Sequence, residues 1–398
     1  MSDTVAENNT SPNVPRDSSR VRGLGPFAYP VFRWLFIASL VGEIGAWMQF
    51  IGAEWLMTEQ TLDPLQVALL GAANSLPVLF LGIPSGVFAD LFGRRRILLI
   101  SQFWMLGVGF LTVFLLRLNT LGPWTLILLT FFLYCGMTMQ EPAMHAVYPE
   151  VVPLRHLPAA VVLHDMEFNV ARVIGPVLAG MVIRKLGTEA AFIANILSFL
   201  GLIWFLWVWR AGRKPEQSAE TLGTAFKSAV SYVRSSRDLQ VILVFVGLHA
   251  ILAVAPGVLL PIVARTKLHL ASDGYGLLYS CLGAGAILGA AIVAPALARL
   301  AANRVMSAGM VLSSISLFAL SRASSQIEAG LFLISSGVGF AVANTTATTL
   351  TQSRLTDWAR GRVLGIWLMV FYGGIAAGSA AFGWLARVTG IGLAQMIT

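Results

Sequence analysis

Two charged residues, Glu43 and Arg172, lie in the middle of long apolar stretches of this sequence. Glu43 is about ten residues, roughly 15 Å of helix, into the first stretch, and Arg172 is about eleven residues from the far end of the fifth. An unpaired ion inside a membrane costs several kcal/mol and usually binds a substrate, carries a proton or pairs with another charge. Their similar depth predicts an ion pair, with Asp165 or a substrate anion as the other partners open to Arg172.

The fifth stretch carries further polar residues. At 100° per residue, Asp165, Asn169 and Arg172 share one helix face, and Glu167 points nearly opposite. The first three are therefore the expected residues of a central site, whereas Glu167 either faces the protein or extends to the lipid headgroups. His249, in the middle of a later stretch, either relays protons or packs as a hydrogen-bonded histidine.

Three weaker signals accompany these. Glu54 follows Glu43 by three turns on one face and is expected at an outer vestibule. Threonines in "NTTATTLTQS", which begins at Asn344, either line a pore or bond back to their own helix. Trp47, Phe50 and Trp55 either stack on an aromatic substrate or serve packing and interfacial roles.

The elements that must position these residues follow from composition. The chain has 398 residues, of which 57% are hydrophobic and 12% charged, which excludes an ordinary water-soluble domain. Only helices satisfy every backbone amide within a single membrane-spanning segment, so the fold class is an all-α polytopic membrane protein. Eleven spans are predicted: 34–57, 66–89, 97–116, 122–141, 158–183, 188–209, 239–263, 273–297, 304–321, 325–350 and 362–385.

Lys and Arg gather in alternate loops, which by the positive-inside rule predicts a cytoplasmic N-terminus. Residues 1–32 have no apolar core and are expected to form a disordered cytosolic tail. The net charge of +8 is then explained by the basic residues of the cytoplasmic loops. It indicates the lipid bilayer as the partner and requires no nucleic acid.

The longest polar segment divides the spans into six and five. It contains a predicted amphipathic helix, which gives an N-terminal half over 33–210, a cytosolic loop over 211–238 and a C-terminal half over 239–398. Related turns between the fourth and fifth spans of each half indicate two parallel halves with a central site, as in secondary transporters. The sequence ends at "GIGLAQMIT", so the last helix is expected to be incomplete.

An enzyme is the alternative class. The five histidines show no His-x-x-x-His spacing with a carboxylate, no serine lies in a nucleophile elbow, and there is no phosphate-binding loop. We therefore expect no catalysis, no cofactor and no metal, and a transport cycle that draws on an ion gradient.

The turn "GVFADLFGRRR" (86–96) places charge between two apolar spans. The carboxylate of Asp90 can accept hydrogen bonds from the N-terminus of a helix in the other half, and Gly86 would let the two backbones approach. The alternative for Arg94 to Arg96 is attachment to anionic lipid, worth about 1 kcal/mol each. We favour the lipid role for Arg95 and Arg96 and the helix contact for Asp90.

This turn resembles the hallmark of the major facilitator superfamily, G-x-x-x-D-[RK]-x-G-[RK]-[RK]. The matching residues are Gly86, Asp90, Gly93, Arg94 and Arg95, and Leu91 replaces the first basic residue. Together with "IGAWMQ", "NVARVIGPVLAG" and "DGYGLLYSCLGAGAILGA", it resembles the exporter branch of the enterobactin exporter and the macrolide-efflux-like proteins. The resemblance implies that Asp90 and Arg94 act as a latch for the outward-facing state, with a partner near "ARGRVLG" at the start of the eleventh span.

The stretch "RVIGPVLAG" resembles the antiporter signature of the same superfamily through Gly175, Pro176 and Gly180. These residues permit close, bent packing against a neighbouring helix, although membrane helices tolerate Gly and Pro in general. The resemblance implies a monomeric, proton-coupled exporter of a small amphipathic molecule, such as a siderophore or drug, in the bacterial inner membrane. A proton-coupled importer and a transport-inactive, truncated membrane protein are the alternatives.

Overall fold

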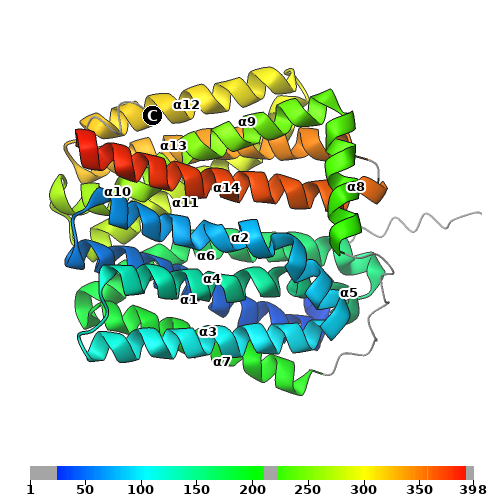
Figure 1. Cartoon of the computed structure of the whole chain (residues 1–398), viewed down its shortest axis with the longest axis horizontal. Helices are drawn as coiled ribbons and strands as arrows, with labels where there is room; N and C mark the ends of the chain where they lie inside the picture. Colours follow the sequence, from blue (N-terminus) through cyan, green and yellow to red (C-terminus); the bar gives the residue numbers. More distant parts are fainter. Residues whose placement is uncertain (1–24, 210–221, 356, 391–398) are drawn as a thin grey trace, which may run out of the picture.

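The computed structural model describes residues 25–209, 222–355 and 357–390, and in these ranges every regular element is a helix (Figure 1). At residues 90, 222–226 and 357–362 the structure describes the backbone and not the side chains. The ends of the chain, including the proposed incomplete last helix, lie outside the described residues.

The N-terminal half has seven α-helices and two short 3₁₀ turns. They are η1 (Gly25–Ala28), α1 (Pro30–Gln60), α2 (Pro64–Phe92), α3 (Arg94–Arg117), α4 (Pro123–His145), α5 (Tyr148–Val151), η2 (Leu154–His156), α6 (Leu157–Leu186) and α7 (Thr188–Val208). A single helix, α8 (Leu222–Ser235), follows within the segment that the sequence marks as amphipathic.

The C-terminal half contains α9 (Arg237–Ala253), α10 (Ala255–Thr266), α11 (Ser272–Leu297), α12 (Ala302–Arg322), α13 (Gln326–Ser353) and α14 (Asp357–Thr389). Eleven segments of the described chain are long and apolar enough to cross a membrane, which confirms the eleven predicted spans. The seventh is not the single helix expected over 239–263, because it breaks between α9 and α10. Pro256 has no N–H to donate to the carbonyl of Leu252, so the ladder is interrupted there.

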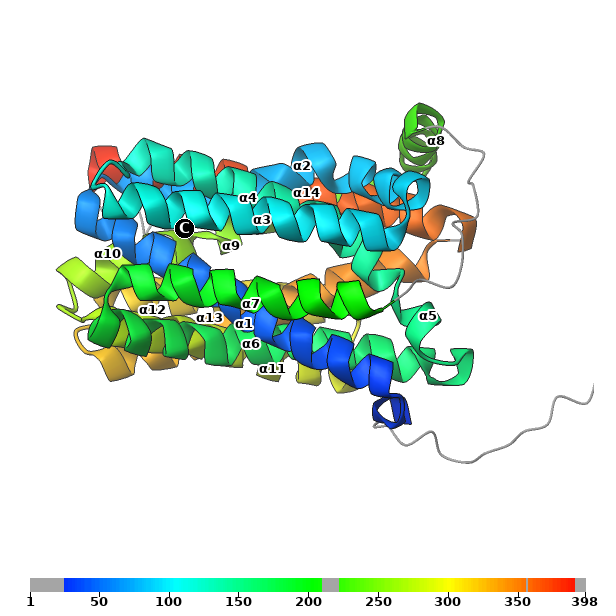
Figure 2. The same ribbon diagram turned by 90° about the horizontal axis from the view of Figure 1, so that it is seen from below.

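The two halves lie side by side, with α14 packed along α2 and α11 packed along α6 (Figures 1 and 2). Helix α8 runs across one end of the bundle, and α10 lies at the opposite end (Figure 1). We call these the α8 end and the α10 end. Helix α1 begins at the α8 end and finishes at the α10 end.

Local chemistry sets the helix boundaries. Helices α1, α2 and α4 each begin with Pro, whose missing N–H falls where a helix has no internal acceptor for it. Asp63 caps α2 by accepting a hydrogen bond from the amide of Leu65 at 3.1 Å. Gly93 alone joins α2 to α3 with φ of +84°, a left-handed value that favours Gly, which explains this member of the hallmark turn.

The expected disordered tail over 1–32 is too long. Residues Gly25–Ala28 form η1, and the ring of Phe27 packs against Phe32 at 5.4 Å and Phe36 at 5.0 Å between centroids. These aromatic contacts bury the start of α1 in the N-terminal core. Residues 1–24 lie outside the described residues.

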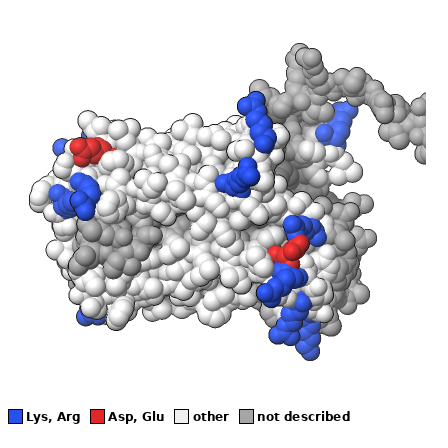
Figure 3. All heavy atoms as spheres, turned by 90° about the horizontal axis from the view of Figure 1, so that it is seen from above, with Lys and Arg blue, Asp and Glu red and all other residues white. Residues whose placement is uncertain are grey.

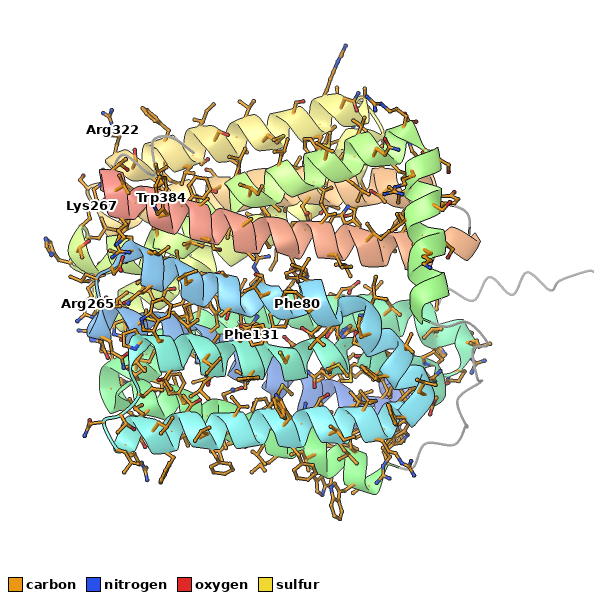
Figure 4. All side chains as sticks on the ribbon, viewed as in Figure 1. Phe80, Phe131, Arg265, Lys267, Arg322 and Trp384 are labelled. Carbon is orange, nitrogen blue, oxygen red and sulfur yellow. The ribbon has the colours of Figure 1, made fainter. Side chains whose placement is uncertain are left out.

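The outer surface is apolar between the two ends. Phe80 is 62% exposed and Trp384 59% exposed on the outside of the bundle (Figure 4). Figure 3 shows the charged side chains of one face gathered toward the two ends, with a largely uncharged band between them. Exposed large apolar side chains over such a band are the pattern of a lipid-facing surface.

Candidate functional site

The halves meet most closely where α6 faces α11. A Cβ atom added to Gly276 would lie 2.1 Å from the carbonyl oxygen of Pro176, and one added to Gly180 would lie 2.5 Å from that of Ser272. Gly175 faces α1 of its own half: a Cβ atom added to Gly175 would lie 2.4 Å from the Cβ atom of Trp47. The stretch with Gly175, Pro176 and Gly180 therefore packs backbone against backbone toward the α10 end.

Contact between α2 and α14 also tightens toward the α10 end. A Cβ atom on Gly383 would lie 2.4 Å from that of Ala68, near the start of α2. Toward the α8 end, the corresponding distances are 3.4 Å from Gly373 to Leu79 and 3.6 Å from Gly365 to Ile83, which are ordinary contacts. Both seams are thus tightest at the same end.

Polar contacts between the halves also lie toward the α10 end. Tyr275 of α11 donates to the buried carboxylate of Glu54 in α1, and Trp55 stacks on Tyr275 with ring centroids 5.9 Å apart. Arg265 of α10 donates to Thr58 at 3.2 Å and lies over the ring of Trp55 at 5.5 Å (Figure 4). The vestibule expected at Glu54 is therefore filled by the other half.

Further contacts join the halves on the same side. Ser280 donates to the carbonyl of Val173 at 2.6 Å, Arg184 pairs with Asp273, and Arg387 approaches Asp63 to 3.6 Å. These contacts between the halves all lie from the middle of the bundle to the α10 end. The molecule is therefore closed at its α10 end.

Arg172 of α6 lies against Gly283 of α11, in the other half, and has no ion pair among the described residues. Its electrostatic neighbours are the phenols of Tyr279 in α11 and Tyr372 in α14, and its Nε has no hydrogen-bond partner. Tyr134 of α4 belongs to the same group of interacting phenols. These three tyrosines could not be singled out from the sequence, since a lone Tyr in an apolar helix has no spacing that marks it as a site residue.

No ion pair joins Glu43 to Arg172, so the predicted pair is wrong, although Tyr372 is an electrostatic neighbour of both. Glu43 lines a cavity within the N-terminal half, and its electrostatic neighbours are Glu141, Glu167 and His164. The two residues do share a depth, but depth leaves the rotation of each helix undetermined, and here α1 turns Glu43 toward α4. The Nε of Arg172 has no hydrogen-bond partner and can therefore donate a hydrogen bond to an anionic group of a substrate.

The effects of Glu43→Gln and Arg172→Gln on stability should therefore be additive. Because no ion pair joins the two residues, the unfolding free energy of the double variant should match the sum of the singles within about 0.5 kcal/mol. Thermal unfolding of the purified protein in detergent measures this. The hydrogen-bonded pair Ser39 and Glu167 is the matched positive control, and a coupling of about 1 kcal/mol or more between Glu43 and Arg172 would contradict the arrangement.

The remaining residues of the fifth span separate as helix geometry requires. Asp165 is exposed, and Asn169 donates from Nδ2 to the carbonyl of Asp165 at 2.7 Å within its own helix. Glu167 is buried and does not extend to the headgroups: it accepts hydrogen bonds at 2.7 Å from Ser39 and from Nδ1 of His164. The roles of Asp165 and Asn169 in transport stay predictions.

His249 is buried in the C-terminal half. It stacks between Phe245 and Phe340, with centroid distances of 6.0 and 5.6 Å, and its Nε2 has no partner. This setting favours the packing alternative over proton relay. Thr348, Thr349 and Thr351 donate to carbonyls of their own helix, which likewise favours the local alternative.

The aromatic residues of α1 pack on protein. Trp47 lies 5.8 Å and Phe50 5.1 Å from the ring of Tyr279, measured between centroids, so both seal the contact between α1 and α11. Their packing role, and that of Trp55, is therefore favoured over stacking on a substrate.

The hallmark turn is anchored within its own half. Arg94 pairs with Glu150 at 2.5 Å and donates to the carbonyl of Ala146 at 2.7 Å. Arg95 donates from Nε to the carbonyl of Leu206 at 2.6 Å. It therefore contacts the protein, whereas attachment to lipid alone was expected. These contacts attach the start of α3 to α4, α5 and α7.

Among the residues whose side chains the structure describes, none has an atom within 4 Å of a Cβ added to Gly86. The side chain of Asp90 and those of its expected partner segment, 357–362, lie outside the described residues. The latch role of Asp90 and Arg94 therefore stays a prediction.

Sequence comparison finds relatives among bacterial transporters. The chain is 22% identical to the staphyloferrin A transporter of Staphylococcus aureus over 372 residues, which cover 90% of each chain. It is 26% identical to the uncharacterized MFS-type transporter YfiS of Bacillus subtilis over 166 residues, 42% of this chain and 39% of that one. It is also 26% identical to the multidrug efflux pump Tap of Mycolicibacterium fortuitum over 180 residues, 41% of this chain and 43% of that one. The matches to YfiS and Tap thus span less than half of those relatives.

Solved structures show the same fold. The nucleoside transporter NupG superposes with a TM-score of 0.74 over 92% of this chain and 95% of that one, at 14% identity. The D-xylose-proton symporter gives a TM-score of 0.68 over 91% and 95%, at 16% identity. The family model for transmembrane secretion effectors matches residues 21–398. A described bundle of eleven candidate spans and this match over nearly the whole chain agree: the protein belongs to the transmembrane secretion effectors of the major facilitator superfamily, and it is a secondary transporter.

Proposed function

We propose that this transporter exports a small amphipathic molecule across the bacterial inner membrane in exchange for protons. In this proposal the α8 end faces the cytoplasm, so the structure, closed at the α10 end, is the form that loads substrate from inside. The relatives named as a multidrug efflux pump and a staphyloferrin A transporter support a small-molecule substrate.

The substrate site proposed here is the central space around Arg172. The guanidinium has an unsatisfied donor, and the phenols of Tyr134, Tyr279 and Tyr372 surround it. An arginine fork binds carboxylate or phosphate oxygens, and phenol rings provide apolar faces beside it. The site thus suits a molecule with an anionic group on an apolar or aromatic body.

One observation carries the coupling proposal: the carboxyl group of Glu54 is buried in the closed seam, only 3% exposed, with the phenol of Tyr275 as its hydrogen-bond partner. The other ionisable groups that act on it are Tyr134 and Tyr279, and Arg265 lies beyond Trp55. Burying a carboxylate without an adjacent cation is costly, whereas the neutral acid is readily buried.

A direction of transport follows from this difference. When the α10 end is open, Glu54 meets the outside and takes up a proton, and the neutral side chain then favours closing that end. Substrate enters from the cytoplasm, and loss of the proton favours opening toward the outside. Protons therefore move inward while substrate moves outward, as in an antiporter.

Comparing cells that lack the protein with cells that overexpress it tests the proposed export. Untargeted mass spectrometry of both cell populations should find at least one amphipathic anion depleted inside, and enriched outside, the overexpressing cells. Inside-out vesicles should then accumulate that compound only with a proton gradient. Accumulation at full rate after the gradient is dissipated would contradict antiport, and greater uptake into overexpressing cells would show an importer.

A further inference from the structure

A second polar cluster lies on α4 and α6 of the N-terminal half. Glu141 and His145 are one turn apart on α4, and His164 faces them from α6. Their ligand atoms all lie within 4.8 Å of one another. The carboxylate of Glu141 is 3.3 Å from Nε2 of His145 and 3.9 Å from Nε2 of His164. The two imidazole rings are nearly perpendicular, with centroids 4.9 Å apart.

A second set of contacts fixes the orientation of His164. Its Nδ1 bonds to the buried carboxylate of Glu167 at 2.7 Å, and Ser39 donates to the same carboxylate oxygen at 2.7 Å. When Nδ1 carries the proton and donates a hydrogen bond to Glu167, Nε2 is left with a free lone pair. That nitrogen lies 3.9 Å from the carboxylate of Glu141. A carboxylate behind the histidine is the outer-shell arrangement that orients metal-binding imidazoles.

The charge of the cluster also points to a cation. Glu43, Glu141 and Glu167 act on one another electrostatically, and the cavity beside them is lined by the amides of Gln102 and Gln140. Among the described residues no Lys or Arg is paired with any of the three carboxylates. Several carboxylates in a membrane bundle require compensation by bound cations or protons.

The cluster is accessible from the α8 end. His145 is the last residue of α4, its side chain is 48% exposed, and that of Glu141 is 56% exposed. His164, in contrast, is only 8% exposed and is held in place by Glu167. An ion can thus enter along α4 and meet one preoriented ligand inside.

We propose that Glu141, His145 and His164 bind a divalent transition-metal ion, with Zn²⁺ as the best match. Two imidazole nitrogens and one carboxylate are a donor set that Zn²⁺ favours, with a fourth position left for water. Glu167 positions His164 and is not itself a ligand. The site lies within one half, so binding connects α4 to α6 and does not depend on the proposed export or on Glu54.

Titration of the purified full-length protein with Zn²⁺ alone tests the site, after removal of any polyhistidine tag and of bound metal. Calorimetry should show one Zn²⁺ per chain. Glu167→Gln should keep that stoichiometry and weaken binding by about 10- to 100-fold, as outer-shell changes do. His145→Ala, at an exposed position, should weaken binding further without changing the melting temperature of the metal-free protein.

His269→Asn is the matched control, because His269 is exposed and remote from the cluster in the sequence. It should bind Zn²⁺ as the wild type does. Absence of binding in the wild type, or equal binding by the wild type and His145→Ala, would overturn the metal site and leave protonated histidines as the compensation for the carboxylates.

Discussion

Replacing Glu54 with Gln is expected to hold the α10 end closed and so to stop proton-driven export. Gln keeps the size and the hydrogen bond to Tyr275 but remains neutral at every pH, like the protonated acid. Proton-driven export of the compound identified in cells should fall to the background of inside-out vesicles. Binding of that compound from the α8 end should persist, because Arg172 and the central tyrosines are unchanged.

Labelling of a cysteine at position 179 reports the conformational part of this prediction. Ala179 is fully buried in the seam, so a membrane-impermeant maleimide reaches this position only when the α10 end opens. In the Glu54 background, labelling should increase as pH rises, because ionisation makes the closed seam costly. In the Glu54→Gln background it should stay low at every pH.

Two controls separate this effect from its alternatives. A cysteine at Leu62, which is 55% exposed at the same end, corrects for the pH dependence of the maleimide itself. Glu59→Gln, at an exposed carboxylate five residues further along α1, should behave like the wild type. If Glu54→Gln transports against a gradient as the wild type does, Glu54 does not carry the coupling proton.

Replacing Gly276 with Ala is expected to have the opposite effect and open the α10 end. The added Cβ atom would lie 2.1 Å from the carbonyl oxygen of Pro176, so α6 and α11 must move apart. Overpacking of this kind costs about 1–3 kcal/mol, and here only the closed form bears the cost. The ratio of closed to open molecules should therefore fall by about 5- to 150-fold.

The same cysteine at position 179 measures this shift, as a higher labelling rate at acidic pH. Gly107→Ala is the control, because nothing lies within 4 Å of a Cβ added at that glycine. Both variants gain helix propensity, so only the steric effect distinguishes them. Unchanged labelling in Gly276→Ala, together with unchanged stability, would contradict the close seam between α6 and α11.

Much of the architecture could be predicted from the sequence, because lipid imposes a simple rule. A span must be apolar for about 20 residues and must satisfy its own backbone, so the eleven segments stand out from composition alone. The break between α9 and α10 is a local matter of one proline, Pro256, which interrupts the ladder but not the apolar run. Hydropathy therefore identified the span and missed its division.

The site residues were harder to predict, because depth along a helix is readable and rotation about its axis is not. Glu43 and Arg172 were expected at one depth, but Glu43 lies among residues of α4 and α6 and Arg172 beside α11, so the expected ion pair does not form. The opposed directions of Glu167 and Arg172 could be predicted, since they lie on one helix with a fixed 100° step. What Glu167 meets, namely Ser39 and His164, depends on how α1 and α6 pack.

The cluster of Glu141, His145 and His164 shows a second reason. Glu141 and His145 are four residues apart and share a helix face, but a search for His-x-x-x-His spacing overlooks such a pair. The third ligand comes from α6, and only the fold brings it near. The central tyrosines lie on α4, α11 and α14, so no spacing in the sequence connects them.

Spin-label distances across both ends of the bundle test the central claim most directly, which is that protonation of Glu54 closes the α10 end while the α8 end opens. One pair joins Lys185 to Arg322 near the α10 end, and the other joins Arg96 to Arg299 near the α8 end, with Cys135 and Cys281 replaced by Ala. On raising the pH, the first distance should lengthen and the second should shorten, and Glu54→Gln should remove both changes. Two distances that do not change with pH, or that change in Glu54→Gln as much as in the wild type, would contradict the account.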